Sequence, residues 1–204
     1  MTTCVCVASG PSLTADQVQM IESARVAGRA HVIVVNNTWE TLPNADVLYA
    51  ADGPWWDVHH TAVEVGFSGE CWTAHADAAK RYGLCFVRVN HRLRGLSRDP
   101  EALAWGQNGG YQAINLAYHF GARRIVLAGY DMMRGPNGET HHHGPHVAPL
   151  SNGDPSGWVR NFDGLAAELA REGVDLINCS ARTALRIPRG DLGTTLSLLE
   201  LEAE

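Results

Sequence analysis

The segment from Thr140 to His146 holds four histidines, three of them consecutive and the fourth after Gly144-Pro145. Because histidine titrates near neutral pH, one of these side chains is a candidate general base or general acid. The alternative is a flexible polar loop without chemistry. Consecutive histidines cannot all face one ion, and no carboxylate pair stands among them at helical spacing, so we predict no metal site.

A second candidate is the turn Gly10-Pro11-Ser12, which directly follows an apolar run at residues 4–8. Gly10 would let the backbone approach a ligand closely, and the helix expected after the turn would present free N–H groups to an anion. The turn matches neither the P-loop nor the G-x-G-x-x-G fingerprint. It is therefore a candidate nucleotide site of another type, or else a plain tight turn.

Asn and Asp residues follow three further apolar runs, and a pair of glycines opens a later helix. In open parallel sheets the carboxyl ends of the strands point into the crevice that binds ligands. The alternative explanation is that Asn and Asp are common turn formers. The candidate binding residues of this kind are Asn36, Asn37, Asp52, Asn108, Gly109, Gly110 and Asp131.

The elements that would position these residues alternate along the chain. Short runs rich in Val and Ile alternate with segments of helical period, which predicts an open α/β fold of Rossmann-like build, with a mostly parallel sheet and helices on both faces. A capping box, Thr14 with Gln17, should start the first helix, and Gly28 should end it. We expect one domain over residues 1–204, with a long lid loop at 129–157. The predicted strands are 4–8, 31–35, 45–50, 84–89, 124–128 and 174–177.

Composition narrows the class of protein. The net charge of -6 disfavours non-specific binding to nucleic acid. Two clusters of arginines, at residues 88–98 and 182–189, are either solvated surface or a local anion site. Five cysteines do not suggest a disulfide framework, and neither a signal peptide nor a membrane span is evident. We therefore expect a cytoplasmic protein that contacts no membrane, and leave its oligomeric state open, a homo-oligomer included.

Taken together, these motifs resemble two related groups: the bacterial sialyltransferases of glycosyltransferase family 42, and the 6-hydroxymethylpterin diphosphokinase MptE-like group. Both open a nucleotide site with a Gly-Pro-Ser-Leu turn, here Gly10 to Leu13, and the sialyltransferases end the next strand with Asn, here Asn36. The further shared features are the helix spacing of Ala113, Ala117 and Gly121, the strand ending Gly129-Tyr130-Asp131, and Asn178-Cys179-Ser180. The chain also looks like small phage and prophage proteins.

The resemblance implies a transferase that uses a nucleotide-activated donor, by analogy a nucleotide sugar. Asn178 and Ser180 would join the nucleotide-binding residues, and the base would be a lid-loop histidine in a His-x-x-Gly-His setting. One inserted residue leaves open whether that base is His146 or His141. Gly109 replaces a Ser of the family pattern and Ser9 an Asn.

No metal or other cofactor would be needed for this reaction. The alternatives are a Mg²⁺-dependent pyrophosphoryl transfer of the MptE-like type, with Asp52 and Asp131 as ligands, and a nucleotide-binding module without catalysis.

Overall fold

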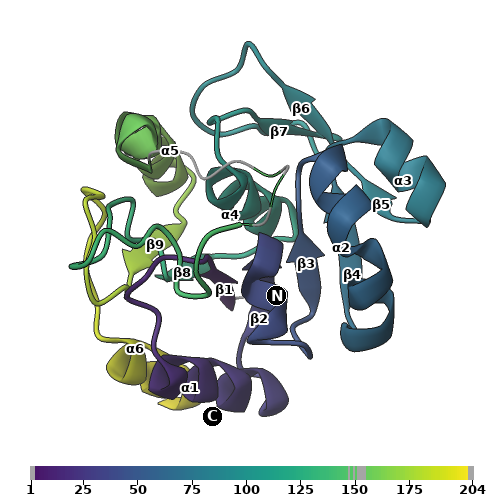
Figure 1. The fold of residues 1–204 in the computed structure, drawn as a ribbon. Helices are drawn as coiled ribbons and strands as arrows, with labels where there is room; N and C mark the ends of the chain where they lie inside the picture. The colour runs from purple at the N-terminus through teal and green to yellow at the C-terminus, as the bar shows by residue number, and fades with distance from the viewer. Residues whose placement is uncertain (1–2, 147, 149, 151–154, 202–204) are drawn as a thin grey trace.

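A sheet of seven parallel strands runs through the computed structural model, which describes residues 3–146, 148, 150 and 155–201 (Figure 1). The strands buried at the centre are rich in β-branched residues, as strands covered on both faces usually are. This arrangement is the predicted open α/β fold of Rossmann-like type. In spatial order the strands are β5 (Cys85–Phe86), β4 (Glu70–Thr73), β3 (Val47–Tyr49), β2 (His31–Val35), β1 (Thr3–Val7), β8 (Arg124–Ala128) and β9 (Asp175–Asn178).

Helices cover both faces of the sheet. Cys4 and Cys6 of β1 point to the face covered by α4 (Gly109–His119) and α5 (Val159–Arg171). Val5 and Val7 point to the opposite face, which packs against the other helices. Those helices are α1 (Ala15–Val26), α2 (Gly53–Gly66), α3 (Ala76–Tyr82) and α6 (Leu192–Leu201).

The direction in which the chain builds the sheet reverses beside β1. Strands β1 to β5 are added outward on one side, and the chain then returns through α4 to place β8 on the other side of β1. Such a reversal opens a crevice at the carboxyl ends of the two strands. Here the ends of β1 and β8 are held together by the Gly10 N–H, which donates to the Gly129 carbonyl over 2.8 Å.

The first helix begins as its sequence predicts. The Thr14 side chain accepts from the Gln17 N–H over 3.2 Å, and the Gln17 side chain accepts in return from the Thr14 N–H. After the helix, Gly28 has a φ of +69°, the left-handed conformation that glycine adopts at helix ends. The capping box thus fixes where α1 begins after the loop at residues 9–12, and Gly28 fixes where it ends.

The predicted strands are confirmed in β1, β2, β3, β8 and β9, with β2 and β8 matching to the residue. The prediction of one strand at 84–89 is wrong. The chain bends at buried Val87, so that β5 pairs with β4 while β6 (Arg88–Asn90) pairs with β7 (Ala102–Ala104) in a separate two-stranded sheet. An apolar run indicates which residues are buried, but not which strand each residue pairs with. The change from one sheet to the other at Val87 therefore cannot be predicted from the sequence pattern.

Few regular elements interrupt the predicted lid loop. Among its described residues, those from Gly129 to Leu150 contain no helix or strand, and the short helix η2 (Pro155–Trp158) begins before its expected end. A second short helix, η1 (Asn36–Glu40), follows β2 directly. Within the described part of the chain, no helix has the length and apolar character that crossing a membrane requires.

Replacing Gly10 by Ala tests the contact between the strand ends. A Cβ at this position would collide with the Gly129 carbonyl oxygen and the Asp131 carboxylate, whereas one at exposed Gly164 in α5 meets nothing. We expect Gly10→Ala to lower the free energy of unfolding by about 1–3 kcal/mol, and the matched Gly164→Ala to raise it by about 0.5–1 kcal/mol. Urea unfolding of both variants measures the difference; equal effects would contradict the close approach.

Candidate functional site

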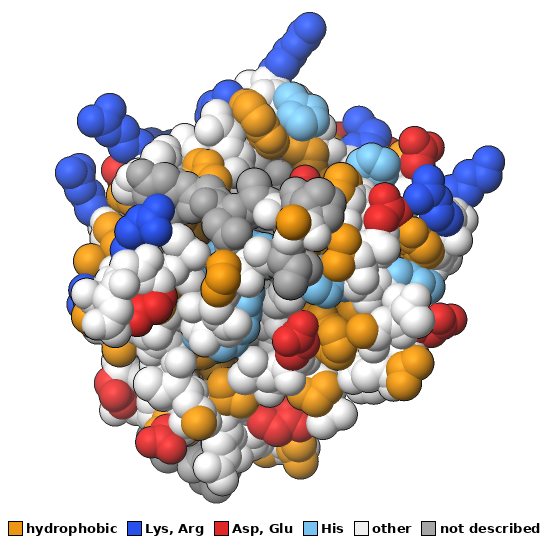
Figure 2. All heavy atoms as spheres, in the orientation of Figure 1, with side chains coloured by type: hydrophobic (Ala, Val, Ile, Leu, Met, Phe, Trp, Pro, Cys, Tyr) orange, Lys and Arg blue, Asp and Glu red, His pale blue; other side chains and the backbone are white. Residues whose placement is uncertain are grey.

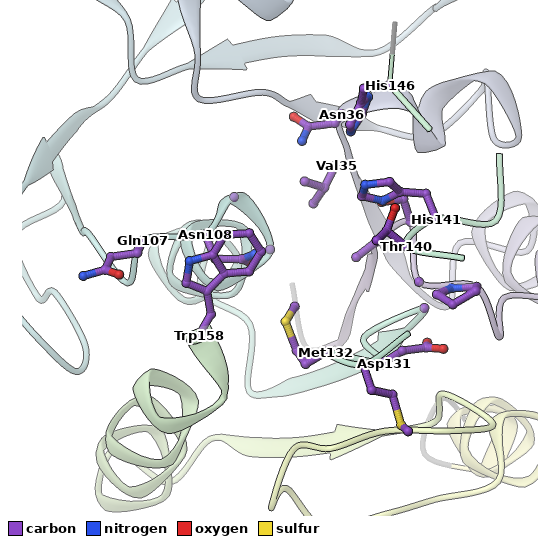
Figure 3. Close-up of a pocket in the computed structure, with 18 of the residues that line it drawn as sticks. Val35, Asn36, Gln107, Asn108, Asp131, Met132, Thr140, His141, His146 and Trp158 are labelled. Carbon is purple, nitrogen blue, oxygen red and sulfur yellow. The ribbon is translucent and has the colours of Figure 1, made fainter. Parts of the chain in front are cut away.

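A cavity of about 260 Å³ opens where the strand order reverses. Its wall is built by the ends of β1, β2 and β8, the start of α4 and the lid loop. Figure 3 shows Gln107, Asn108 and Trp158 on one side, with Asn36, His141 and His146 facing them across the space. The volume lies near the lower end of the range for small-molecule sites, so the cavity suits one small ligand rather than a macromolecule.

The start of α4, at Gly109 and Gly110, supplies backbone hydrogen-bond donors to this cavity. The turn at Gly10 and Pro11 also lines the cavity but offers no free N–H, because the Gly10 N–H donates to Gly129 and proline has none. Asn108 caps α4, because its side chain accepts from the Tyr111 N–H over 3.1 Å. The first N–H groups of the helix therefore remain for a ligand, at the end where the helix dipole favours an anion.

Asn36 is one of two polar cavity residues, with Gln107, that combine a positive φ with a side chain for which no hydrogen bond is found among the described residues. Its φ of +49° is rare for a residue other than glycine, although Asn tolerates it better than most. Among the described residues no side-chain hydrogen bond of Asn36 is found, and its amide faces the cavity beside His146 (Figure 3). Strain of this kind persists where the surrounding structure enforces it, and it clusters at ligand sites.

Asp131 lies at the cavity floor with both carboxylate oxygens engaged. Oδ2 accepts from the Ser12 N–H over 2.9 Å, and Oδ1 accepts from the Ser12 hydroxyl over 2.7 Å. Burial raises the pKa of the Asp131 carboxyl, although these hydrogen bonds and the charge of Arg182 oppose the shift. Asp131 therefore orients the Gly10 turn through Ser12, which does not itself line the cavity.

Besides Ser12, three predicted binding residues do not reach the cavity. Asn37 accepts from the Trp55 indole over 2.8 Å and donates to Glu40 over 3.2 Å. Asn178 and Ser180 are buried, and their side chains hold the chain after β8: Asn178 donates to the Tyr130 carbonyl and Ser180 accepts from the Tyr130 N–H. These three side chains support the walls of the site rather than line it.

Asp52, by contrast, does line the cavity, at the end of β3. Desolvation raises the pKa of its carboxyl, and nearby His75 partly counteracts this shift. As the residue before α2, Asp52 makes no side-chain capping hydrogen bond. Its carboxylate is thus available to a ligand at the mouth of the site.

The histidine segment is tied to the cavity at two points. His141 Nδ1 lies 2.8 Å from the Ser9 hydroxyl, and the His142 N–H donates to the Ser9 carbonyl over 2.9 Å. The His142 ring turns away instead, with Nε2 3.1 Å from the Thr41 hydroxyl. The lid loop is therefore anchored to the first strand end and to the segment after η1.

His141, His143 and His146 come together, although the argument from consecutive histidines predicted no such group. One ring nitrogen from each lies within 4.8 Å of the others. Burial, followed by the neighbouring histidines, lowers the pKa of His141 and His143 to about 4. Burial and His59 also lower the pKa of His146, against the opposing effect of Glu40. At neutral pH the first two rings are thus uncharged and carry lone pairs.

Several cavity residues were missed in the sequence. Trp158 ends η2, and its indole lies in the cavity opposite Asn36 (Figure 3). Gln107 and Met132, with φ of +60° and +47°, also line the cavity. Their positions next to Asn108 and Asp131 in the sequence made them candidates for the cavity. The positive φ that turns them inward, however, cannot be predicted from their residue types.

The arginine clusters lie outside the cavity, because none of its described lining residues is Lys or Arg. Figure 2 shows the basic side chains projecting from the upper and outer edges of this face. Arg88 pairs with Asp99 and Glu101, and Arg98 pairs with Glu168 and Glu172. These exposed pairs are typical of solvated surface, where they stabilise the fold little.

Replacing Asp131 by Asn tests the raised pKa of this carboxyl. The folded state holds the proton to a higher pH than the unfolded state, in which the pKa is about 3.9. The stability of the wild type relative to Asp131→Asn should therefore fall as the pH rises from about 4 through the folded pKa, and then level off. Urea unfolding of both proteins across this pH range measures it. A difference that rises with pH, or stays flat, would contradict the assignment.

Comparisons with known proteins assign no family to the chain. No protein-family model matches it, and no curated protein is significantly similar to it. The resemblance to glycosyltransferase family 42 and the MptE-like group therefore stays a prediction carried by short motifs. What the molecule does has to be argued from the geometry of the cavity.

Proposed function

We propose that the protein is a transferase that binds a nucleotide-activated donor, most simply a nucleotide sugar, and activates an acceptor hydroxyl with a lid-loop histidine. One observation carries this proposal: the cavity at the strand reversal brings Gly10, Asn36, Gly109 and Gly110 together with His141 and His146. A donor-binding wall and a row of potential bases thus face the same space.

The donor wall suits a phosphate held without cations. Since no described lining residue is Lys or Arg, an anion here would depend on the N–H groups at the start of α4. Glycines at these positions leave the backbone uncovered, and a Cβ at Gly110 would come within 3.0 Å of the Asn108 side chain. This pattern supports a nucleotide phosphate as the group that is bound.

The two sides of the cavity suit different parts of the donor. The half-exposed Trp158 indole offers a flat aromatic surface on which a nucleobase can stack. On the opposite side, the Asn36 amide can donate to and accept from hydroxyl groups of a sugar. His146 lies next to Asn36 and therefore close to the sugar end of such a ligand (Figure 3).

Of the two candidate bases, His146 is better placed than His141. A general base must be unprotonated yet basic enough to take a proton. The pKa of His141 is lowered to about 4, and its Nδ1 already interacts with Ser9, so it is a weak base with a positioning role. Burial lowers the pKa of His146 as well, but His146 lines the cavity beside Asn36, at the side proposed for the sugar (Figure 3).

The proposed step balances without a cofactor. His146 takes the proton from the acceptor hydroxyl while the acceptor oxygen forms a bond to the donor sugar carbon. The bond from that carbon to the phosphate oxygen breaks, and its electron pair leaves with the nucleotide. N–H groups at the start of α4 stabilise the negative charge that develops on the leaving phosphate.

The Mg²⁺-dependent alternative is less well supported. It needs Asp52 and Asp131 as metal ligands, but both oxygens of Asp131 accept hydrogen bonds from Ser12. A nucleotide-binding module without catalysis would use the same cavity. Only a measurement of turnover distinguishes such a module from a transferase.

Nucleotide binding is testable by thermal shift with a panel of nucleotides and nucleotide sugars, with and without Mg²⁺. A ligand at 100 times its Kd should add about 2.7 kcal/mol of stability. We expect a cytidine or uridine compound to stabilise the protein equally with and without Mg²⁺. A shift only with a purine triphosphate and Mg²⁺ would support the phosphoryl-transfer alternative instead, and no shift with any compound would overturn nucleotide binding.

The variant Asn36→Gly tests whether the Asn36 side chain contacts the bound nucleotide sugar. Glycine adopts a φ of +49° without strain, so the variant should be at least as stable as the wild type while lacking the amide. We expect its affinity for the nucleotide sugar to fall about 10-fold, the size of one lost hydrogen bond. Unchanged affinity, measured by calorimetry, would remove Asn36 from the site.

Measuring the turnover of a His146 variant tests whether His146 is the general base. With a donor identified by the panel, His146→Gln should lower the release of free nucleotide at least about 100-fold, the usual contribution of a general base, and leave the Kd of the donor nearly unchanged. The matched control is His142→Gln, whose side chain faces Thr41 and should retain full turnover. Full turnover of His146→Gln would reject the assignment of the base.

A further inference from the structure

The three histidines that meet beside the cavity have no carboxylate among them. His141 and His143 stack with their ring centroids 5.1 Å apart and their planes at 5°. The His146 ring lies 4.6 Å from His141 and 5.2 Å from His143. One nitrogen from each lies within 4.8 Å of the others, whereas His142, between them in sequence, faces Thr41.

We propose that His141, His143 and His146 form a binding site for one transition-metal ion of the Zn²⁺ type. Imidazole nitrogen suits Zn²⁺, Co²⁺, Ni²⁺ and Cu²⁺, whereas Mg²⁺ and Ca²⁺ require oxygen ligands. A set of three histidines with a fourth position left for water is a known arrangement of catalytic zinc. His141 and His146 both line the cavity, so that fourth position faces the space proposed for the donor and acceptor.

The distances are compatible with this ion. Nitrogens bound to tetrahedral zinc at about 2.0–2.1 Å lie roughly 3.3 Å from one another. The rings must therefore close by at most about 1.5 Å from the 4.8 Å seen here, which is within reach of side-chain rotation in a loop.

Two further observations point to a ligand. The His143 Nε2 atom is buried and has no hydrogen-bond partner among the described residues, which is costly unless something binds there. His141 is held by the Ser9 hydroxyl at Nδ1, in the way that outer partners orient histidines that bind metals.

Metal binding at this triad does not depend on the transfer proposed above, although His146 takes part in both. A nitrogen that coordinates an ion cannot also accept a proton, so His146 is the base only while the triad is free of metal. In the loaded protein, a metal-bound water in the fourth position would supply the base. Chelation therefore returns the protein to the state in which His146 is the base, whereas removing His146 impairs turnover in both states.

The experiment measures Zn²⁺ binding to the full chain by calorimetry, and Co²⁺ binding by its visible absorption. We expect one ion per chain, and a visible spectrum typical of four-coordinate Co²⁺. His143→Gln should weaken Zn²⁺ binding more than about 100-fold, beyond the range seen for loss of an outer partner, whereas Ser9→Ala should weaken it about 10-fold. His142→Gln, one residue away but with its side chain turned toward Thr41, should bind like the wild type.

Two outcomes overturn the site. One is that the wild type binds neither ion, and the other is that His143→Gln binds Zn²⁺ as tightly as the wild type, since binding would then belong to other histidines. The far-ultraviolet circular dichroism and urea midpoint of each variant report whether it folds. His143 does not line the cavity, so donor affinity of His143→Gln separates failure of the metal site from failure of nucleotide binding.

Discussion

The close approach of two strand ends underlies everything else in this molecule. Gly10 after β1 and Gly129 after β8 touch through a backbone hydrogen bond, and a side chain on Gly10 would collide with the neighbouring strand end. Because the sheet reverses between these strands, this contact also forms the floor of the cavity. A larger residue would separate the strand ends and displace the Ser12–Asp131 pair with them. The geometry of the site is thus inseparable from the packing of the sheet.

The same turn positions the histidines. Ser9, one residue before Gly10, holds the His141 ring through its hydroxyl and the His142 backbone through its carbonyl. A displacement of the first strand end is therefore passed directly to the lid loop. The Thr41 contact of His142 adds a second anchor on the far side of β2. These contacts give a defined position to His141 and His142, in the part of the lid loop where the described residues form no helix or strand.

Much of the fold could be predicted because strands that are buried on both faces of the sheet appear in the sequence as continuous apolar runs. β2 contains the β-branched run 32–35 and β8 the apolar run 125–128, and the capping box of α1 is a local signal that needs no tertiary information. The bend at Val87 could not be predicted, since Val87 is as buried as a strand residue would be while its neighbours pair with different sheets. Hydrophobicity reports whether a residue is covered, and not which strand it pairs with.

The site could be predicted to the level of strand ends but not of individual side chains. Asn36 and Asn37 are the same residue type in adjacent positions, yet one faces the cavity and the other binds Trp55. The positive φ of Asn36 decides this difference, and tertiary packing imposes that φ. The histidine triad depends likewise on the path of the loop, which selects positions 141, 143 and 146 and turns 142 away. Neither the orientation of the two asparagines nor the selection of these three histidines can be predicted from the spacing of residues in the sequence.

The electrostatics of the cavity constrain what can bind there. Asp131 and Asp52 contribute carboxylates, and no cationic side chain stands among the described lining residues to offset an anionic ligand. An anion beside Asp131 would be repelled if the carboxylate were bare, but Ser12 covers both of its oxygens. The raised pKa of Asp131 shows that burial already disfavours its charge, and a bound phosphate would disfavour it further. Phosphate binding and protonation of Asp131 should therefore reinforce each other, so that the affinity of the site for an anion rises as the pH falls toward the pKa of this buried carboxyl.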